Sequence, residues 1–310
     1  MPYVVDFHTH SSYSADGVIP PADLVRSAKA NNPAISHMAL SDHNTFSGCP
    51  DFLAACGQHG IEGFVFAEIS GTHPDMPATE FHFLTCLGAA WTDSVVRRAG
   101  LFTAHFNRLS RVDTENMFLF LEAAGQLDIR ISWRQVVRES TEVYRHLPPG
   151  QDPDMIAPPA FHHLRKIIRD GGFGEQTTSR KTDLEARVWK QAAVRPLPTP
   201  SITDAYPIYR QARPAVILAH PMLYSYTPDE LRPYIREWQR EMGLMGLECH
   251  YGNVLDAKWK ALADDLGLLV SAGSDRHTSY EAGNSKASVP VVHEDHADIV
   301  SLIDVLRAVG

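Results

Sequence analysis

The sequence lacks a long apolar run, paired cysteines and an excess of positive charge. No apolar stretch approaches the roughly 18 to 20 residues that a membrane-spanning helix needs, so we expect no transmembrane segment. The first residues lack the features of a secretory leader. Four cysteines without paired spacing fit reduced thiols better than a disulfide framework or a zinc ribbon, and we expect a cytoplasmic protein. They are Cys49, Cys56, Cys86 and Cys249.

The charge balance argues against a protein that coats nucleic acid. The formal net charge is −9, so we expect no long nucleic acid as a partner. Residues 97–213 are mildly basic, with 18 Lys and Arg against 13 Asp and Glu. This stretch could attract an anionic substrate, or its charges could simply be solvated helix faces.

Short apolar segments alternate with helix-like stretches along most of the chain. Alternation of this kind predicts parallel β/α units, and seven of them predict a closed or nearly closed barrel. Residues 97–195 break the rhythm with mostly helical stretches. We therefore expect a barrel domain formed by residues 1–96 and 196–310, and a helical insertion at 97–195 that serves as a substrate platform or lid. The expected strands are residues 3–5, 35–40, 63–67, 80–84, 215–219, 245–248 and 268–272.

Metal-binding residue types recur where these strands end. His8 and His10 lie two apart, so on a strand both side chains would point to one face. In a parallel β/α barrel the chemistry lies where strands give way to the following loops, and one such residue alone would mean little. The full set converging on one rim predicts a metal centre. Its members are His8, His10, Asp16, His43, Glu68, His82, His220, Asp275 and His277.

The combination of these stretches resembles the PHP family, the polymerase and histidinol phosphatase superfamily of metal-dependent phosphoesterases. The resemblance implies a distorted (β/α)7 TIM-like barrel with two or three divalent metal ions at its C-terminal rim. The matching stretches are His8-Thr9-His10, Ser14-Ala15-Asp16-Gly17, Ser41-Asp42-His43-Asn44-Thr45, Glu68-Ile69-Ser70, His82 with Leu87-Gly88, Ala219-His220-Pro221 and Gly273-Ser274-Asp275-Arg276-His277.

Within the family, the insertion is most similar to the nucleotide-phosphatase-like branch. Residues 162–171 resemble the Arg-Pro-His-x-x-Arg-Ala-Leu pattern of that branch, but Ala160-Phe161 stands where Arg-Pro is usual. Any contact made by that arginine is therefore missing from this chain.

Barrel closure places the first strand beside the last, so His8, His10 and Asp275 should share a metal. Glu68 can bridge two ions because a carboxylate has two oxygens. We expect a second ion at Glu68, His82 and His220, and a third at Asp16, His43 and His277; the resemblance implies the same grouping. Mixed imidazole and carboxylate ligands suit manganese, iron or zinc. Asp42 is expected to orient His43 or to cap the following turn.

Clustered divalent ions favour phosphate-ester hydrolysis, in which a metal-bridging hydroxide attacks phosphorus. Glu68 would bridge the ions, and His220 or His277, where it is not fully committed to a metal, would protonate the leaving oxygen. Arginine forks onto phosphate oxygens, so Arg165 and Arg276, together with His163, are the candidate substrate contacts. The expected substrate is a nucleoside monophosphate or a 3′,5′-bisphosphate. Alternatives are histidinol phosphate, removal of 5′ nucleotides from short RNA, and a non-catalytic metal-stabilised module that binds a nucleotide.

Overall fold

The computed structural model describes residues 3–14, 16–17, 19–127, 129–143, 163–164, 167–168, 188–190, 196–280, 291–292 and 296–309. The chain contacts divide it into two compact units, Met1–His105 with Ser201–Gly310, and Phe106–Pro200. The insertion proposed at 97–195 begins inside a long helix, α3 (Asp93–Gln126). Among the described helices, none combines the length and the apolar character needed to cross a membrane.

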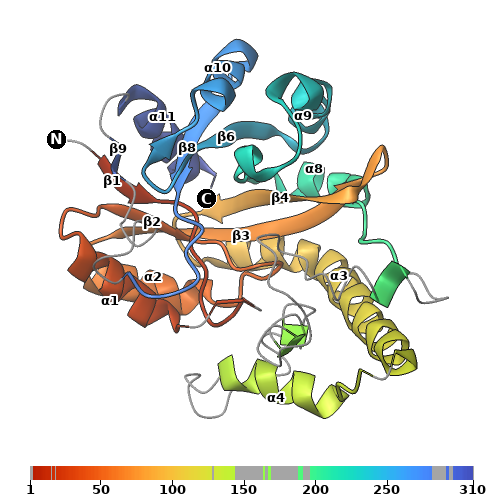
Figure 1. Ribbon diagram of the computed structural model, residues 1–310. Coiled ribbons are helices and arrows are strands. Elements are labelled where there is room, and N and C mark those ends of the chain that lie inside the picture. The colour runs from red at the N-terminus through yellow and green to blue at the C-terminus, as the bar shows by residue number, and fades with distance from the viewer. Residues whose placement is uncertain are drawn as a thin grey trace. The chain divides into compact units, whose positions relative to one another are not determined.

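The first unit contains a curved sheet that nearly closes into a barrel (Figure 1). The strands follow the order β7-β6-β5-β4-β3-β2-β1-β9, and β8 pairs with β6. The amide of Phe7 donates to the carbonyl of Ala272, which brings the end of β8 to the end of β1. The expected distorted TIM-like barrel is thereby confirmed. The strands are β1 (Tyr3–Asp6), β2 (His37–Leu40), β3 (Glu62–His73), β4 (Met76–Gly88), β5 (Ala215–Leu218), β6 (Leu244–Tyr251), β7 (Val254–Leu255), β8 (Leu269–Gly273) and β9 (Val291–Val292).

One part of the sheet departs from the expected parallel units. β3 and β4 form a long antiparallel hairpin without a helix between them, and β4 is also antiparallel to β5. Parallel strands need a crossover connection of a dozen or more residues, whereas only two residues separate these strands. The expectation of parallel units throughout was therefore wrong at β4, and this hairpin accounts for part of the distortion of the barrel.

Helices pack against both faces of the sheet: α11 lies on the face that carries Phe64 and Phe66, and α1 and α2 lie on the opposite face. α1 and α2 lie side by side and pack their apolar faces with β2 (Figure 1). α9 begins with a capping box, in which Thr227 and Glu230 each bond the other's backbone amide. The helices of this unit are α1 (Pro21–Asn31), α2 (Cys49–Gln58), the start of α3, α8 (Tyr206–Ala212), α9 (Pro228–Met242), α10 (Ala257–Leu266) and α11 (His296–Ala308).

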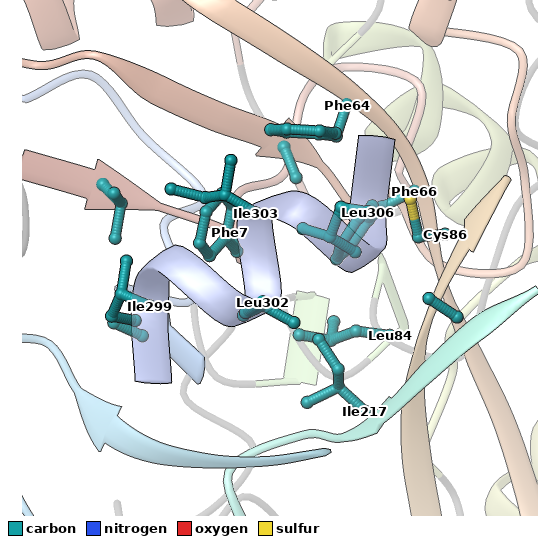
Figure 2. Packing of buried hydrophobic residues seen from close by; sticks show 14 of the residues in the cluster. Phe7, Phe64, Phe66, Leu84, Cys86, Ile217, Ile299, Leu302, Ile303 and Leu306 are labelled. Carbon is teal, nitrogen blue, oxygen red and sulfur yellow. The ribbon is translucent and has the colours of Figure 1, made fainter. Parts of the chain in front are cut away.

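The main core lies between α11 and the strands. Figure 2 shows the apolar side chains of α11 packed against aromatic and aliphatic residues that follow β1 or lie in β3, β4 and β5. Fully burying one such side chain stabilises the fold by about 1.5–3 kcal/mol. This apolar packing supports the strand ends that carry the polar residues. The labelled core residues are Phe7, Phe64, Phe66, Leu84, Cys86, Ile217, Ile299, Leu302, Ile303 and Leu306.

The second unit has its own apolar cluster. The end of α3 and α4 (Trp133–Val143) contribute most of the described residues, and Leu164, Ile168 and Val188 complete it. This unit therefore has the buried apolar residues that an independently packed helical subdomain requires.

Gly273, at the end of β8, marks a point where the barrel has no room for a side chain. A Cβ atom there would lie 2.2 Å from Oε1 of Glu248 and 2.2 Å from Cβ of His8. Contacts this short force neighbouring groups to move. Glycine at this position is therefore what allows β8, β6 and the end of β1 to meet.

We predict that Gly273→Ala lowers the free energy of unfolding by about 1–3 kcal/mol, the usual cost of overpacking. The matched control is Gly57→Ala, because a Cβ atom at Gly57 in α2 meets nothing within 4 Å. That control should be neutral or should stabilise the protein by up to about 1 kcal/mol. Urea unfolding of the full chain measures both, and equal stability of the two variants would contradict the packing account.

Candidate metal centre

The nine predicted metal ligands gather in one cluster at the rim of the barrel. His8 and His10 follow β1, His43 follows β2, His220 follows β5, and Asp275 with His277 follows β8. Asp16 reaches the cluster from the loop after β1. Glu68 was expected to close the third strand but lies in the middle of β3, whereas His82 lies inside β4, as expected.

The β3–β4 hairpin explains this placement. Its register pairs Glu68 with Leu84 and Ser70 with His82. Paired residues and residues two apart share a face of an antiparallel sheet, so Glu68 and His82 are diagonal neighbours on one face. The pairing of β3 with β4 therefore brings Glu68 and His82 together, although both strands continue beyond these residues.

Glu68 lies at the centre of the cluster and is completely buried. Its two carboxylate oxygens lie 2.8–3.3 Å from ring nitrogens of five histidines. Oε2 faces three of the rings and Oε1 faces the other two, so this carboxylate has the geometry that bridging two cations requires. The rings facing Oε2 belong to His8, His10 and His43, and those facing Oε1 belong to His82 and His220.

Three sets of ligand atoms lie within 4.8 Å of one another inside each set. One set coincides with the first predicted group and includes Glu68. The set around Asp16 contains the third predicted group together with His10. The last set contains His43 where the prediction had His220, whose Nε2 nevertheless lies 3.0 Å from Oε1 of Glu68. The sets are His8, His10, Glu68 and Asp275; His10, Asp16, His43 and His277; and His43, Glu68 and His82.

The cluster fits divalent ions because several of its buried nitrogen and oxygen atoms have no hydrogen-bond partner. Buried polar atoms normally have a hydrogen-bond partner, yet several atoms that face the centre of this cluster have none. Nε2 of His8, Nε2 of His10 and Oε2 of Glu68 are examples. Imidazole nitrogens and carboxylate oxygens with unused lone pairs are the donors that manganese, iron and zinc take.

Opposite charges set the protonation of the metal-free cluster. Burial lowers the pKa of His8, but the carboxylates of Glu248, Glu68 and Asp275 outweigh it and hold that pKa well above its usual value. The pKa values of three more histidines are raised in the same way, against the effect of burial, by nearby carboxylates. They are His10, His43 and His277.

The pKa values of three carboxylates and of His220 are lowered instead of raised. Burial raises the pKa of Glu68, but the neighbouring histidines outweigh it and hold that pKa well below its usual value. Asp16 behaves in the same way, and the pKa of Asp275 is also lowered. The pKa of His220 is lowered chiefly by burial. In the metal-free chain, protons on four imidazoles thus balance ionised carboxylates.

The backbone at three strand ends adopts a conformation that is unusual for residues with a side chain. Asn44, His220 and Asp275 have positive φ angles of 54°, 29° and 52°. Such a residue costs of order 1–3 kcal/mol, and these conformations cluster at functional sites. The tight turns direct the His220 and Asp275 side chains towards the cluster.

Residues outside the predicted set hold the ligands in place. Asp42 does not orient His43 through its side chain; its carboxylate accepts hydrogen bonds from the amide and hydroxyl of Ser11, which fixes the loop after β1. Asp6, which the sequence analysis missed, accepts from the amides of His8 and Ser274. Burial raises the pKa of Asp6 to about 6. In the sequence, the only indication of this role was that Asp6 directly follows the apolar residues of the first strand.

The three predicted substrate contacts have different surroundings. Arg276 stands between two ligands in sequence, but its buried side chain lies over the ring of Tyr280, with the guanidinium carbon 5.1 Å from the ring centroid. Its Nε and Nη2 have no hydrogen-bond partner. His163 is buried within the second unit. Arg165 lies outside the described residues.

We predict that metal binding near neutral pH releases protons. The raised pKa values mean that four histidines keep protons above pH 6.5, and a metal ligand must be neutral imidazole. The lowered pKa values of Glu68, Asp16 and Asp275 mean that these carboxylates have no proton to give. Affinity for Mn²⁺ should therefore keep rising with pH above 6.5.

Calorimetric titration with Mn²⁺ at pH 7.5, in buffers of different ionisation enthalpy, measures the protons released. The expected result is a binding heat that changes with the buffer and indicates more than one proton per chain. A heat independent of the buffer would show that the histidines are already neutral and would contradict the charge balance described here.

Comparison with known proteins agrees with this geometry. Residues 6–126 match the family model of the PHP domain, a stretch that contains every predicted ligand from His8 to His82. No curated protein matches the chain. The fold is similar to that of an amidohydrolase from Chromobacterium violaceum, solved with bound sulfate and no metal, with a TM-score of 0.68 and 19% identity over 98% of this chain and 96% of that one.

A protein described as a metal-dependent phosphoesterase from Bifidobacterium adolescentis has a similar fold as well. Its TM-score is 0.67, with 19% identity over 99% of this chain and 98% of that chain. The ligand cluster on the barrel rim lies partly inside the stretch that matches the family model. Residues 6–126 of this chain carry a PHP domain.

Proposed function

We propose that this protein is a metal-dependent phosphoesterase that hydrolyses a phosphate monoester of a small molecule. The substrate that we propose is a nucleotide. The observation that carries the proposal is the buried Glu68 carboxylate surrounded by five imidazole nitrogens at 2.8–3.3 Å. A site built in this way can hold two or three divalent ions close together. The phosphoesterase named among the proteins of similar fold supports the reaction type.

Bound divalent ions would supply a water of lowered pKa and would neutralise charge on phosphoryl oxygens. The chain's own residues would hold these ions, with His8, His10 and Asp275 on one side of Glu68 and His82 with His220 on the other. The site thus concentrates positive charge where a phosphate ester carries negative charge, which favours binding of the ester.

The more exposed part of the cluster marks the side from which a substrate would enter. The side chains of Asp16, His43 and His277 are 21–27% exposed, whereas those of His8 and His10 are fully buried. A phosphate ester approaching from solvent would meet Asp16, His43 and His277 first.

Of the two histidines proposed as proton donors, His277 suits that role better. Burial lowers its pKa, but Asp16 and Asp275 outweigh that effect and raise it, so the ring holds a proton near neutral pH as long as it does not itself bind an ion, which requires a neutral imidazole. His220 is buried with a lowered pKa and is neutral there. A group that donates a proton to the leaving oxygen must be protonated when substrate binds.

We propose a nucleoside monophosphate or a 3′,5′-bisphosphate as the substrate. Two guanidinium nitrogens of Arg276 have no hydrogen-bond partner, which leaves donors for a phosphate oxygen. Arg165 and His163, in the second unit, are the proposed contacts to the nucleotide. The net charge of −9 argues against a long polyanionic substrate.

We predict that Glu68→Gln abolishes hydrolysis while the protein still folds. The substitution removes the charge that the five histidines surround, so at least one ion should be lost or misplaced. Activity on p-nitrophenyl phosphate with added Mn²⁺ and metal content after dialysis measure the two effects. Glu62→Gln is the control, because Glu62 lies in the same strand and pairs with Arg307 on the surface.

A near-normal kcat with full metal content in Glu68→Gln would overturn the bridging assignment. Wild-type protein that binds metal in stoichiometric amount but hydrolyses no ester in a panel of nucleotides, histidinol phosphate, short RNA and p-nitrophenyl phosphate would indicate a binding module instead of an enzyme.

We also predict that two arginine variants change the KM values for a nucleotide and for p-nitrophenyl phosphate in different ways. If Arg276 contacts the phosphate, Arg276→Ala should raise the KM of both substrates by roughly tenfold or more, the value of a hydrogen bond to a charged group. If Arg165 contacts the nucleoside, Arg165→Ala should raise KM for the nucleotide alone. Equal losses on both substrates in Arg165→Ala would exclude that role.

A further inference from the structure

Glu248 is a buried carboxylate that neither the predicted ligand set nor the ligand groups of the structure include. It lies in β6, between β5, which ends before His220, and β8, which ends before Asp275. Its side chain is completely buried. A carboxylate in such a position costs free energy unless it is hydrogen-bonded, so its contacts should show what it does.

The two contacts of Glu248 lead to ligands on opposite sides of Glu68. Both of its oxygens lie 3.1 Å from Nδ1 of His8, and Oε2 accepts a hydrogen bond of 2.6 Å from the backbone amide of His220. His8 belongs to the ligand set around Oε2 of Glu68, whereas His220 faces Oε1. The Glu248 carboxylate therefore contacts one residue that faces Oε2 of Glu68 and one that faces Oε1.

The contact with His8 also determines which ring nitrogen is free. When Nδ1 donates its proton to Glu248, Nε2 keeps its lone pair, and Nε2 lies 3.2 Å from Glu68 and 3.5 Å from Asp275. Metal-binding histidines commonly donate their second ring N–H to a carboxylate, which fixes the tautomer and the orientation of the ring.

The contact with His220 holds a strained backbone. His220 has a φ angle of 29°, which non-glycine residues rarely adopt, and its amide points at Glu248. The rings of His8 and His220 stack with centroids 5.4 Å apart. Gly273 makes room for this arrangement, because a Cβ atom there would collide with both Glu248 and His8.

We propose that Glu248 is a positioning residue that organises both halves of the metal centre at once. It orients the ring of His8 for an ion on one side of Glu68 and holds the backbone turn that presents His220 on the other. The proposal concerns the metal centre of the proposed phosphoesterase but requires only metal binding, and it predicts that losing Glu248 weakens two ions together.

The test is Glu248→Gln in the full chain, with Mn²⁺ binding measured by calorimetry and by metal content after dialysis. Glutamine keeps the shape of the side chain but loses its charge. One of the two accepting oxygens of Glu248 is replaced by an NH₂ group, which cannot accept a hydrogen bond from His8 or His220. Weaker binding by about 10- to 100-fold is expected, the usual effect of removing such a partner. Two ions per chain should be affected.

The control is Glu237→Gln, which makes the same change in α9, where Oε1 of Glu237 accepts a hydrogen bond from Tyr206. It should bind Mn²⁺ as the wild type does. Wild-type affinity in Glu248→Gln would overturn the proposal, and loss of one ion alone would overturn the claim that both halves are organised together. Because metal binding is measured, a protein without phosphoesterase activity would leave this result intact.

A second measurement decides the question even if Glu248→Gln fails to fold. In Zn²⁺-loaded wild-type protein with ¹⁵N-labelled histidine, nitrogen chemical shifts identify which ring nitrogen carries the proton. His8, assigned from the spectrum of His8→Ala, should show a protonated Nδ1 and a metal-bound Nε2. A metal-bound Nδ1 in His8 would exclude the contact with Glu248 and overturn the proposal.

Discussion

The structure of the site depends on compensating the buried charge of Glu68. A carboxylate removed from water is costly by itself, and it is tolerated only where cations or hydrogen-bond donors surround it. Here the compensation comes from five imidazole rings, and those rings come from four separate segments of the barrel. The strand ends must therefore meet at one place. The protons on the histidines can supply the positive charge in the absence of metal, and divalent ions can replace them.

The barrel meets this requirement by departing from a regular parallel arrangement. The antiparallel β3–β4 hairpin brings Glu68 and His82 together on one face, although neither lies at the end of a strand. Positive φ angles at His220 and Asp275 turn two further ligands inwards. Asp6, Asp42 and Glu248 then fix the backbone or the rings behind the ligands. The irregular features of this barrel thus coincide with the places where it carries ligands.

Much of the ligand set could be predicted because it follows a simple physical rule. Side chains two apart on a strand share a face, and the ends of parallel strands meet at one rim, so His8, His10, His220 and Asp275 could be placed from the sequence alone. The residues behind them could not. Asp6 and Glu248 look like ordinary strand residues, and their roles depend on which strands are neighbours and on side-chain orientation. The direction of β4 was missed because short apolar runs do not reveal whether a connection is a hairpin or a crossover.

The central claim is that Glu68 bridges divalent ions held by the surrounding histidines. Crystals of the full chain equilibrated with Mn²⁺, measured near the manganese absorption edge, test it most directly. The account predicts at least two anomalous peaks that flank the Glu68 carboxylate, one bound through each oxygen, with His8 and His10 at one and His82 at the other. A single peak that Glu68 does not touch, or peaks only at other positions on the chain, would contradict it.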